Sequence, residues 1–442
     1  MSSDWQLATI EEIAAPQPSA LATGPFGSSI SSKYFTTSGV PVIRGSNLSA
    51  EVSTRLLDEG LVFVSPEKAA EFQRSIARRG DLVFTCWGTI NQVGFIDGHA
   101  KYDSYIVSNK QMKLTVDSTK VDPRFLYYVF SAPEKQKEIL DNGIGSSVPG
   151  FNLGQLRRHE VLLPSLQGQV VIADFLESFD GRIAVLRETN ATLEAIAQAL
   201  FKSWFVDFDP VRAKQEGRAP DGMDEATAAL FPDAFEESEL GLVPRGWAAR
   251  SLDSFADYLN GLALQKYPPE SDDEYLPVIK IAQLRAGSTS GADRASSRLK
   301  PEYVVRDGDV LFSWSGTLEV ELWCGGDGAL NQHLFKVTSS EVPKWFYYLA
   351  TRHFLPRFRD IAAHKATTMG HIQRKHLTEA RLAIPPAHVL ASLSELVAPL
   401  FERRIANSLQ ARYVASLRDT LLPRLISGQL RLPEAEAEAL AA

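Results

Sequence analysis

The chain has 442 residues, of which 44% are hydrophobic and 23% are charged, and its net charge is −8. This length exceeds the size at which single hydrophobic cores stop growing, so we expect more than one domain, and the composition excludes a disordered or fibrous protein. No run of about 18 apolar residues predicts a membrane span, and the N-terminal sequence lacks the basic and then apolar order of a signal peptide. We therefore expect a cytoplasmic protein that makes no contact with a membrane.

Residues 1–165 are predicted to form a first mixed α/β domain. Short β-branched or aromatic runs such as Leu82–Thr85 alternate with Gly, Asn and Ser turns, and Phe125–Leu140 has a helical pattern. Trp87 ends an apolar run, so we expect its ring in the core, and we expect the same of Trp314 later in the chain. The two cysteines, Cys86 and Cys324, lack disulfide or metal-ligand spacing and are expected to be packing residues.

Residues 166–208 are predicted to form a long helix that acts as a spacer. Apolar residues recur at alternating spacings of four and three from Ile172 to Trp204, which is the seam of a coiled coil. Asn190 is the polar residue of this seam and is of the kind that fixes register. A helix of this length needs a partner. Its own duplicate is the favoured partner, and packing on its own domain is the alternative.

Residues 209–245 are expected to be an acidic linker. The net charge is concentrated here: residues 216–240 carry −7, residues 270–274 carry −4 and the tail after Leu432 carries −3. Without these three segments the rest of the chain carries +6, so the acidic total is weak evidence against a nucleic-acid partner.

Residues 246–386 are predicted to form a second domain that repeats the first, followed by a second long helix over 387–428 and a tail over 429–442. The stretch RGDLVFTCWGT at 79–89 returns as DGDVLFSWSGT at 307–317, and other blocks repeat in the same order. These other pairs are Pro41–Leu48 with Pro277–Leu284, Asn109–Gln111 with Asn331–His333, Asp122–Phe130 with Val342–Ala350, His159–Pro164 with Ala380–Pro385, and Phe179–Ala184 with Phe401–Ala406. The fold class is therefore α+β, as a tandem duplication of a mixed α/β domain plus a long helix.

Sequence patterns for catalysis are missing. The chain has no Gly-rich phosphate loop ending in Lys-Ser or Lys-Thr, no Gly-x-Ser-x-Gly, no His-Glu-x-x-His and no Asn/Asp-Pro-Pro-aromatic motif of amino-methyltransferases. His364, His371 and His376 are close in sequence, but basic residues flank them and no carboxylate has ligand spacing. We therefore expect no metal site and no catalytic residues in this chain.

The predicted loops instead carry side chains that read base edges or hold phosphates in DNA complexes. The candidate DNA-binding residues of the first domain are Ser28, Ser29, Lys33, Arg44, Asn47, Thr89, Asn91, Gln92, Gln111, Ser146, Ser147 and Asn152. Those of the second domain are Lys280, Gln283, Thr317, Gln332, His333, Thr367, Thr368, His371 and Lys375. Any single one of them is more often a turn residue, so the prediction depends on their recurrence at matching places in both halves.

Over essentially its whole length the chain resembles the specificity subunit of type I restriction-modification enzymes. The most specific pieces, beside the repeated Gly-Asp strands, are GPFGSSI at 24–30, LFKSWFVDFDPVRAK at 200–214, TTMGHIQRKHL at 367–377 and LRDTLLPRLISGQL at 417–430. The resemblance implies that each domain is a target recognition domain reading one half of a split, asymmetric DNA sequence. It also implies that the two helices pair as an antiparallel coiled coil.

Further expectations follow from the same resemblance. Two modification subunits, which are adenine methyltransferases, and restriction subunits for cleavage and translocation would dock on the chain. S-adenosylmethionine, ATP and Mg²⁺ would belong to those partners, with no cofactor in this chain. The alternatives are the specificity chain of a fused bipartite type II system, an enzyme active alone, and a scaffold that ignores DNA sequence. Single-molecule methylation mapping, turnover by the purified chain and a shared motif in bound DNA discriminate among them.

Overall fold

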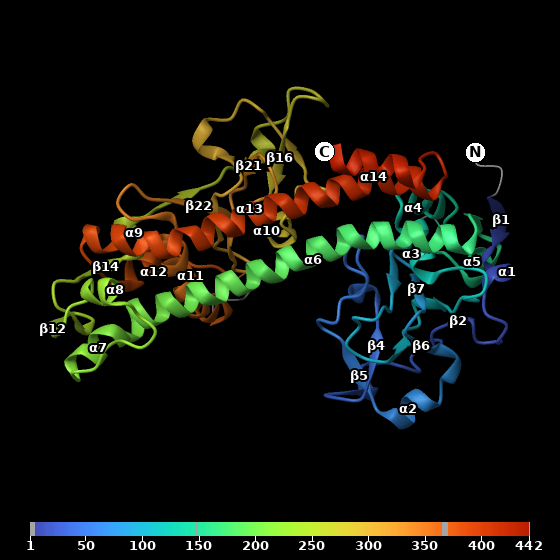
Figure 1. The fold of residues 1–442 in the computed structure, drawn as a ribbon, viewed down its shortest axis with the longest axis horizontal. Helices are drawn as coiled ribbons and strands as arrows, with labels where there is room; N and C mark the ends of the chain where they lie inside the picture. The colour runs from blue at the N-terminus through green and yellow to red at the C-terminus, as the bar shows by residue number, and fades with distance from the viewer. Residues whose placement is uncertain (1–4, 146–148, 365–369, 442) are drawn as a thin grey trace. The chain divides into compact units, whose positions relative to one another are not determined.

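A computed structural model describes residues 5–145, 149–364 and 370–441, and it divides into two compact units. Unit 1 consists of residues 1–184 and 413–442, and unit 2 of residues 185–412. The two long helices, α6 (Leu166–Lys202) and α13 (Ala387–Ile426), each contribute one part to either unit. Each unit is described by itself below, and Figure 1 labels the elements. Within the described ranges, we find no helix with both the length and the apolar character that crossing a bilayer requires.

Unit 1 has three sheets and several short helices around one main core (Figure 1). Its strands are β1 (Gln6–Thr9), β2 (Leu21–Thr23), β3 (Phe35–Thr36), β4 (Val40–Ile43), β5 (Val62–Val64), β6 (Ile76–Arg78), β7 (Leu82–Thr85), β8 (Val93–Phe95), β9 (Ser104–Val107), β10 (Gln111–Leu114) and β11 (Glu160–Leu163). Its helices are α1 (Ile10–Ile13), α2 (Pro66–Ala70), α3 (Pro123–Ser131), α4 (Pro133–Asp141), α5 (Leu153–Arg158) and α14 (Leu432–Ala441). The sheet orders are β1-β11, β2-β10-β7-β8 and β3-β5-β4-β9-β6.

Helix α3 joins the sheets of unit 1 to its helices. Asp122 caps the helix by accepting from the Arg124 amide, and Pro123 occupies its first turn, where the missing N–H costs nothing. Seven consecutive residues, 125–131, are buried, because α3 lies between β8 and the main core. The first part of α6 and the end of α13 complete that core through Leu176, Leu421 and Leu425, none of which is exposed.

His159, which follows α5, gives unit 1 a pH-dependent stability. Burial and the nearby Lys135 lower the pKa of its imidazole from 6.5 to about 4, while Glu138 acts in the opposite direction. The unfolded chain therefore takes up a proton between pH 6.5 and about 4 that the folded unit does not bind, so stability falls as the pH drops through this window. Between pH 7 and pH 5 this amounts to about 2 kcal/mol.

Replacing His159 by Phe should remove this dependence, because the ring keeps its contacts with Phe130 and Phe151 but no longer titrates. Urea unfolding measures the free energy of unfolding of H159F and of the wild type at pH 7 and at pH 5. We expect the wild type to lose more stability between these pH values than H159F, and groups common to both proteins cancel in this comparison. If both proteins lost the same amount, the assignment to His159 would be wrong.

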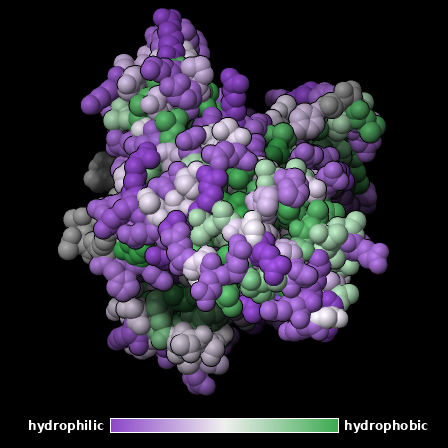
Figure 2. All heavy atoms as spheres, turned by 90° about the vertical axis from the view of Figure 1, so that its left-hand side faces the viewer, coloured by the Kyte–Doolittle hydropathy of each residue, from purple (hydrophilic) through white to green (hydrophobic). Residues whose placement is uncertain are grey.

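Unit 2 repeats the architecture of unit 1. Its strands are β12 (Phe235–Ser238), β13 (Gly241–Pro244), β14 (Ala248–Ser251), β15 (Asp257–Asn260), β16 (Leu276–Ile279), β17 (Arg294–Ala295), β18 (Val304–Val305), β19 (Val310–Ser313), β20 (Val320–Leu322), β21 (Gly328–Leu330), β22 (Leu334–Thr338) and β23 (Arg381–Ile384). Its helices are α7 (Asp209–Gln215), α8 (Glu225–Ala229), α9 (Leu252–Phe255), α10 (Ile281–Ala286), α11 (Lys344–His364) and α12 (Arg374–Glu379). On the face seen in Figure 2 most residues are hydrophilic, with apolar residues in small groups between them.

The sheet orders confirm the duplication predicted from the sequence. The pair β14-β23 corresponds to β1-β11, and β15-β22-β19-β20 corresponds to β2-β10-β7-β8. In addition, β16 pairs in parallel with β21, as β4 does with β9. The register changes one detail of the expected alignment. Thr85 pairs with Gln111, whereas Ser313 pairs with Leu334, so Gln111 corresponds to Leu334 and not to His333.

The two long helices pair antiparallel within unit 2, as expected. Asn190 on α6 donates to the Arg404 carbonyl at 3.1 Å and to Ser408 Oγ at 2.9 Å, and it accepts from Asn407 Nδ2 at 3.0 Å. One turn further along α6, Glu194 binds Arg404, so the sequence rises along one helix as it falls along the other. The polar seam residue thus satisfies its amide across the helix pair and fixes the register.

Two segments are more ordered than expected. Residues 209–245, expected to be a linker, form α7, α8 and the hairpin β12-β13, and Val211, Phe231 and Val243 from them enter the main core of unit 2. The acidic residues lie on the outside of these elements, which is why the composition resembles a linker. The expected tail forms α14, which packs Ala435 into the core of unit 1 and pairs Glu438 with Arg424.

Candidate nucleic-acid interface

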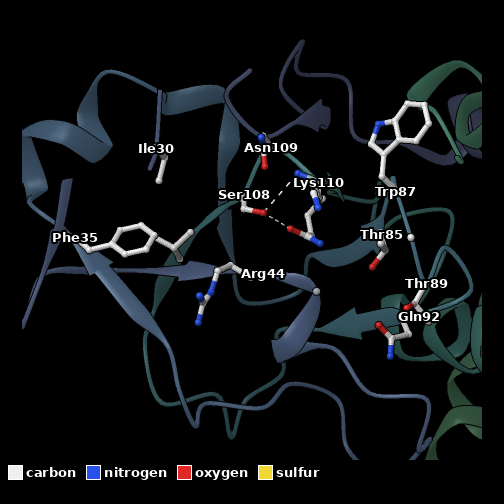
Figure 3. A pocket seen from close by; sticks show the side chains of 14 residues that line it. Ile30, Phe35, Arg44, Thr85, Trp87, Thr89, Gln92, Ser108, Asn109 and Lys110 are labelled. Atoms are coloured by element: carbon white, nitrogen blue, oxygen red, sulfur yellow. Dashed lines mark hydrogen bonds between the residues drawn. The ribbon is translucent and has the colours of Figure 1, made fainter. Parts of the chain in front are cut away.

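A cavity of about 460 Å³ in unit 1 collects several of the predicted DNA-binding residues (Figure 3). Strands of both larger sheets line it, together with the turns that follow β7 and β9. In Figure 3, Ile30 and Phe35 lie on one side, Trp87, Thr89 and Gln92 on the other, and Ser108 to Lys110 between them. The lining residues are Ile30, Phe35, Val42, Arg44, Gly45, Thr85, Trp87, Gly88, Thr89, Gln92, Ser108, Asn109, Lys110 and Gln111.

Thr85 and Gln111 are buried neighbours in this lining. Thr85 ends β7 and Gln111 begins β10, and the two residues are directly paired in the antiparallel ladder, so their side chains share one face of the sheet. Their exposed fractions are 2% and 0%. Ser108 Oγ donates to Gln111 Oε1, which leaves the amide nitrogen of Gln111 as the remaining polar group of that side chain.

Three polar atoms in this lining have no hydrogen-bond partner among the residues that the structure describes. They are Gln111 Nε2, Thr85 Oγ1 and Arg44 Nε. Arg44 is held at its other end, where Nη2 donates to the Gly60 carbonyl at 2.7 Å. A buried polar atom without a partner is costly, so three in one cavity indicate a binding site and not a packing interior.

Glycine brings the loop at 24–31 against this cavity. A Cβ on Gly24 would lie 1.9 Å from the Ser108 carbonyl oxygen, so only glycine fits there. Asn109 Nδ2 then donates to the Gly27 carbonyl at 3.2 Å and anchors the tip of the loop. The same close approach of a glycine to a backbone carbonyl occurs in unit 2, where a Cβ on Gly261 would lie 2.3 Å from the Asn331 carbonyl oxygen.

Asn47 differs from the expectation of a DNA contact. Its side chain is completely buried, and Nδ2 donates to the carbonyls of Leu57 and Glu59 at 3.0 and 3.2 Å. Its Oδ1 accepts from the Arg44 amide at 3.0 Å. Asn47 therefore fixes the loop behind Arg44, and backbone groups use both ends of its amide.

The other predicted residues of unit 1 that the structure describes lie outside the cavity. Ser28 and Lys33 are exposed, Ser29 Oγ donates to the Phe26 carbonyl, and Lys33 lies over the ring of Tyr34. Asn152 accepts from the Gln155 amide and caps α5, which is a structural role. Half-buried Asn91 lies in the turn after β7. Ser146 and Ser147 lie outside the described residues.

Unit 2 gathers a different set of side chains at the end of β19. His333 Nδ1 lies 3.0 Å from Ser315 Oγ, and Gln332 Nε2 lies 3.4 Å from His333 Nε2. The ring of Trp314 lies 5.9 Å from that of His333 and 6.4 Å from that of His371. The structure thus brings three predicted residues together around Trp314, which is half-buried and packs against the edge of the main core of unit 2.

The remaining predictions in unit 2 are scattered. Lys280 pairs with Asp293, and Gln283 accepts from the Lys280 amide at the start of α10. Thr317 is exposed on the turn after β19, and Lys375 is exposed on α12. Thr367 and Thr368 lie outside the described residues. Sequence reasoning thus located the turns, but it did not show which side chains meet.

Trp87 and Thr85 are two of the lining residues that the sequence did not place in the cavity. Trp87 was expected in the core, yet it is 50% exposed and stands against Gly150, where a Cβ would lie 2.6 Å from the ring. Thr85, together with Phe35, Ser108 and Lys110, was missed as a lining residue. One signal was available in the sequence, because Thr85 and Ser313 both end the repeated Gly-Asp strand with a hydroxyl.

The side chains gathered in both units are hydrogen-bonding and aromatic groups. Within residues 5–145, 149–364 and 370–441, no group of three or more His, Cys, Asp or Glu side chains is placed to hold a metal. Cys86 is buried in the core, where burial raises the pKa of its thiol to about 12, so it is not a nucleophile near neutral pH. The geometry defines a duplicated protein in which one scaffold presents two unlike polar surfaces.

Comparisons with known proteins agree with this class. The type I restriction modification DNA specificity domain matches residues 23–195. The chain is 25% identical over 339 residues to the type I restriction enzyme MjaIX specificity subunit of Methanocaldococcus jannaschii, covering 74% of each chain. It is 23% identical over 376 residues to the HindI specificity subunit of Haemophilus influenzae, covering 74% of this chain and 82% of the relative.

A solved structure of a type I restriction-modification S subunit from M. genitalium covers 96% of this chain and 97% of its own, at 13% identity and a TM-score of 0.48. The family model and the curated relatives support a specificity subunit of a type I restriction-modification system. These relatives are named as the specificity subunits of their systems.

Proposed function

We propose that this chain binds double-stranded DNA and reads a two-part, asymmetric site, one part with each unit. The observation that carries this proposal is the repeated scaffold with unlike contents. At corresponding strand ends, unit 1 offers Thr85 and Gln111, whereas unit 2 offers Ser313 and Leu334. Two copies of one scaffold with different side chains can recognise two different half-sites, whereas two identical copies would read two equal half-sites.

The partners and cofactors form part of the same proposal. Two modification subunits would bring an adenine methyltransferase to the half-sites, and restriction subunits would add cleavage. S-adenosylmethionine, ATP and Mg²⁺ would be bound by these partners, and the complex would act in the cytoplasm on the host genome. An adenine inside a duplex must be turned out of the stack before it is methylated, so the specificity chain has only to position the enzyme.

Single-molecule methylation mapping of the host genome, with and without the gene, tests the proposal. We expect one two-part motif with methylated adenine to disappear when the gene is removed. If no methylated motif depends on the gene, the proposal fails. A motif that persists only as one continuous sequence would also contradict the two-unit reading.

A segment exchange tests the division of labour. Residues 44–109 carry β5 to β9 and most of the cavity lining of unit 1. Replacing them with the corresponding residues of a relative that reads another motif should change one half of the methylated motif completely. The other half should stay as in the wild type, because no residue of unit 2 is altered. The matched control exchanges residues 280–331 of unit 2 and should change the opposite half.

A further inference from the structure

We propose that the cavity of unit 1 is a specificity pocket that recognises the major-groove edge of one guanine, with Gln111, Arg44 and Thr85 as the discriminating residues. This inference rests on the proposed function, because it assumes that unit 1 meets DNA. It adds a requirement that DNA binding alone does not imply. The pocket offers hydrogen-bond donors, so its ligand must offer acceptors.

The first step is the polarity of Gln111. Its Oε1 accepts from Ser108 Oγ, so the amide presents Nε2–H to the cavity as a donor. Gly45 lies on that side, and a Cβ there would be 3.5 Å from Nε2, so no side chain of residue 45 closes this approach. With Oε1 paired to Ser108, Nε2 is the amide atom of Gln111 that has no partner within the described ranges.

The second step adds Arg44. Its guanidinium has no acceptor capacity, and Nε is unpartnered within the described ranges while Nη2 is used by the Gly60 carbonyl. Thr85 supplies a hydroxyl that adapts to either role. Two obligate donors and one adaptable group therefore converge on one cavity, which Lys110, on the exposed rim, makes more positive.

The third step identifies the ligand. Among the four bases, guanine presents two adjacent acceptors, N7 and O6, to the major groove, whereas adenine places a donor beside N7 and cytosine offers a donor. The apolar residues of the lining include Ile30, Phe35 and Val42. Apolar side chains suit the weakly hydrated edge of a base better than a phosphate, which is strongly hydrated. A phosphate is the alternative occupant that the experiment separates.

Unit 2 provides an internal comparison. Ser313, the counterpart of Thr85, has its hydroxyl fully used, since Oγ donates to the Thr317 carbonyl at 2.7 Å and accepts from the Glu319 amide at 2.7 Å. Its cross-strand neighbour is the buried, apolar Leu334. At this strand end the hydroxyl of unit 2 has hydrogen-bond partners within the unit, whereas the hydroxyl of unit 1 has none among the described residues. Scaffold geometry does not explain this difference, and a ligand specific to unit 1 does.

The experiment uses the complex of the full chain with its modification subunits and duplexes that carry the mapped motif. Each guanine of the half-site read by unit 1 is replaced in turn by 7-deazaguanine, which lacks the N7 acceptor. At one position we expect methylation kcat/KM to fall about tenfold, which corresponds to about 1.4 kcal/mol. The variant Q111M should lose this sensitivity at the same position and should accept other bases there, while the second half of its motif stays unchanged.

Two further variants keep the test decisive. T85V removes an unpartnered hydroxyl without changing the shape of the side chain, so the fold should persist while discrimination at that position drops. S313A, the matched control in unit 2, should leave the first half-site unchanged. If methylphosphonate substitution of a neighbouring phosphate, and not 7-deazaguanine, abolishes the difference between wild type and Q111M, the pocket binds a phosphate and the inference is overturned.

The outcomes also separate this inference from the proposed function. A wild-type complex that methylates no two-part motif would contradict the proposed function itself. A wild-type complex that methylates its motif but is insensitive to 7-deazaguanine throughout the first half-site would contradict only the guanine pocket.

Discussion

Replacing Arg418 by Met should destabilise unit 1 by about 3–5 kcal/mol. Arg418 lies on α13 with 1% of its surface exposed and forms an ion pair with Asp180 on α6. Asp180 also accepts from Tyr128 Oη at 2.6 Å, so one carboxylate ties the sheet-bearing part of the unit to both helices. Met fills much of the same space but leaves the carboxylate buried without its closest cation. Hydrogen exchange followed by mass spectrometry measures the loss, because it reports the opening of unit 1 separately from unit 2.

Two controls separate charge from packing in this prediction. R424M changes the same residue type on the same helix, but the Arg424–Glu438 pair is solvated, with exposed fractions of 39% and 44%, so this variant should lose far less stability than R418M. Adding D180N to R418M removes the unpaired charge and should restore part of the lost stability. Equal stability of R418M and R424M would show that the buried pair is not what holds the helices.

Local patterns explain which parts of the fold were predictable. The seam of α6 repeats every three and four residues, so its pairing and the role of Asn190 follow from the sequence alone. The repeated Gly-Asp strands fall at β7 and β19 in both units. In contrast, the one-residue difference that matches Gln111 with Leu334 depends on strand register, which is set by contacts between distant segments.

The candidate site was harder to predict, because residue type does not tell what a side chain binds. Asn47 and Gln111 are both buried amides, yet carbonyls from residues 57 and 59 satisfy the first and leave nothing for a ligand. The second retains an unpartnered nitrogen. The prediction of a linker at residues 209–245 was wrong for a similar reason. Exposed carboxylates alternate there with a few apolar residues that pack into the core, such as Phe231. The average composition of the segment does not reveal these buried residues.

Replacing Trp345 by Ala should destabilise unit 2 by about 3–5 kcal/mol, whereas the same change at Trp87 should cost unit 1 less than about 1 kcal/mol. Trp345 on α11 is 1% exposed, and its Nε1 donates to Ser394 Oγ on α13 at 2.8 Å. Its ring lies 6.0 Å from that of Phe205, which follows α6, so it joins three helices. Trp87 is 50% exposed and leaves no cavity when truncated.

The two tryptophan variants distinguish folding from recognition. Hydrogen exchange should show faster opening throughout unit 2 in W345A. Under the proposed function, the loss of unit 2 should also remove methylation of the whole motif, because a two-part site would need both units. W87A should keep wild-type exchange rates, so any change in its methylated motif would be confined to the half read by unit 1. If W87A unfolded unit 1, or if W345A left unit 2 intact, the assignment of these rings to surface and core would be wrong.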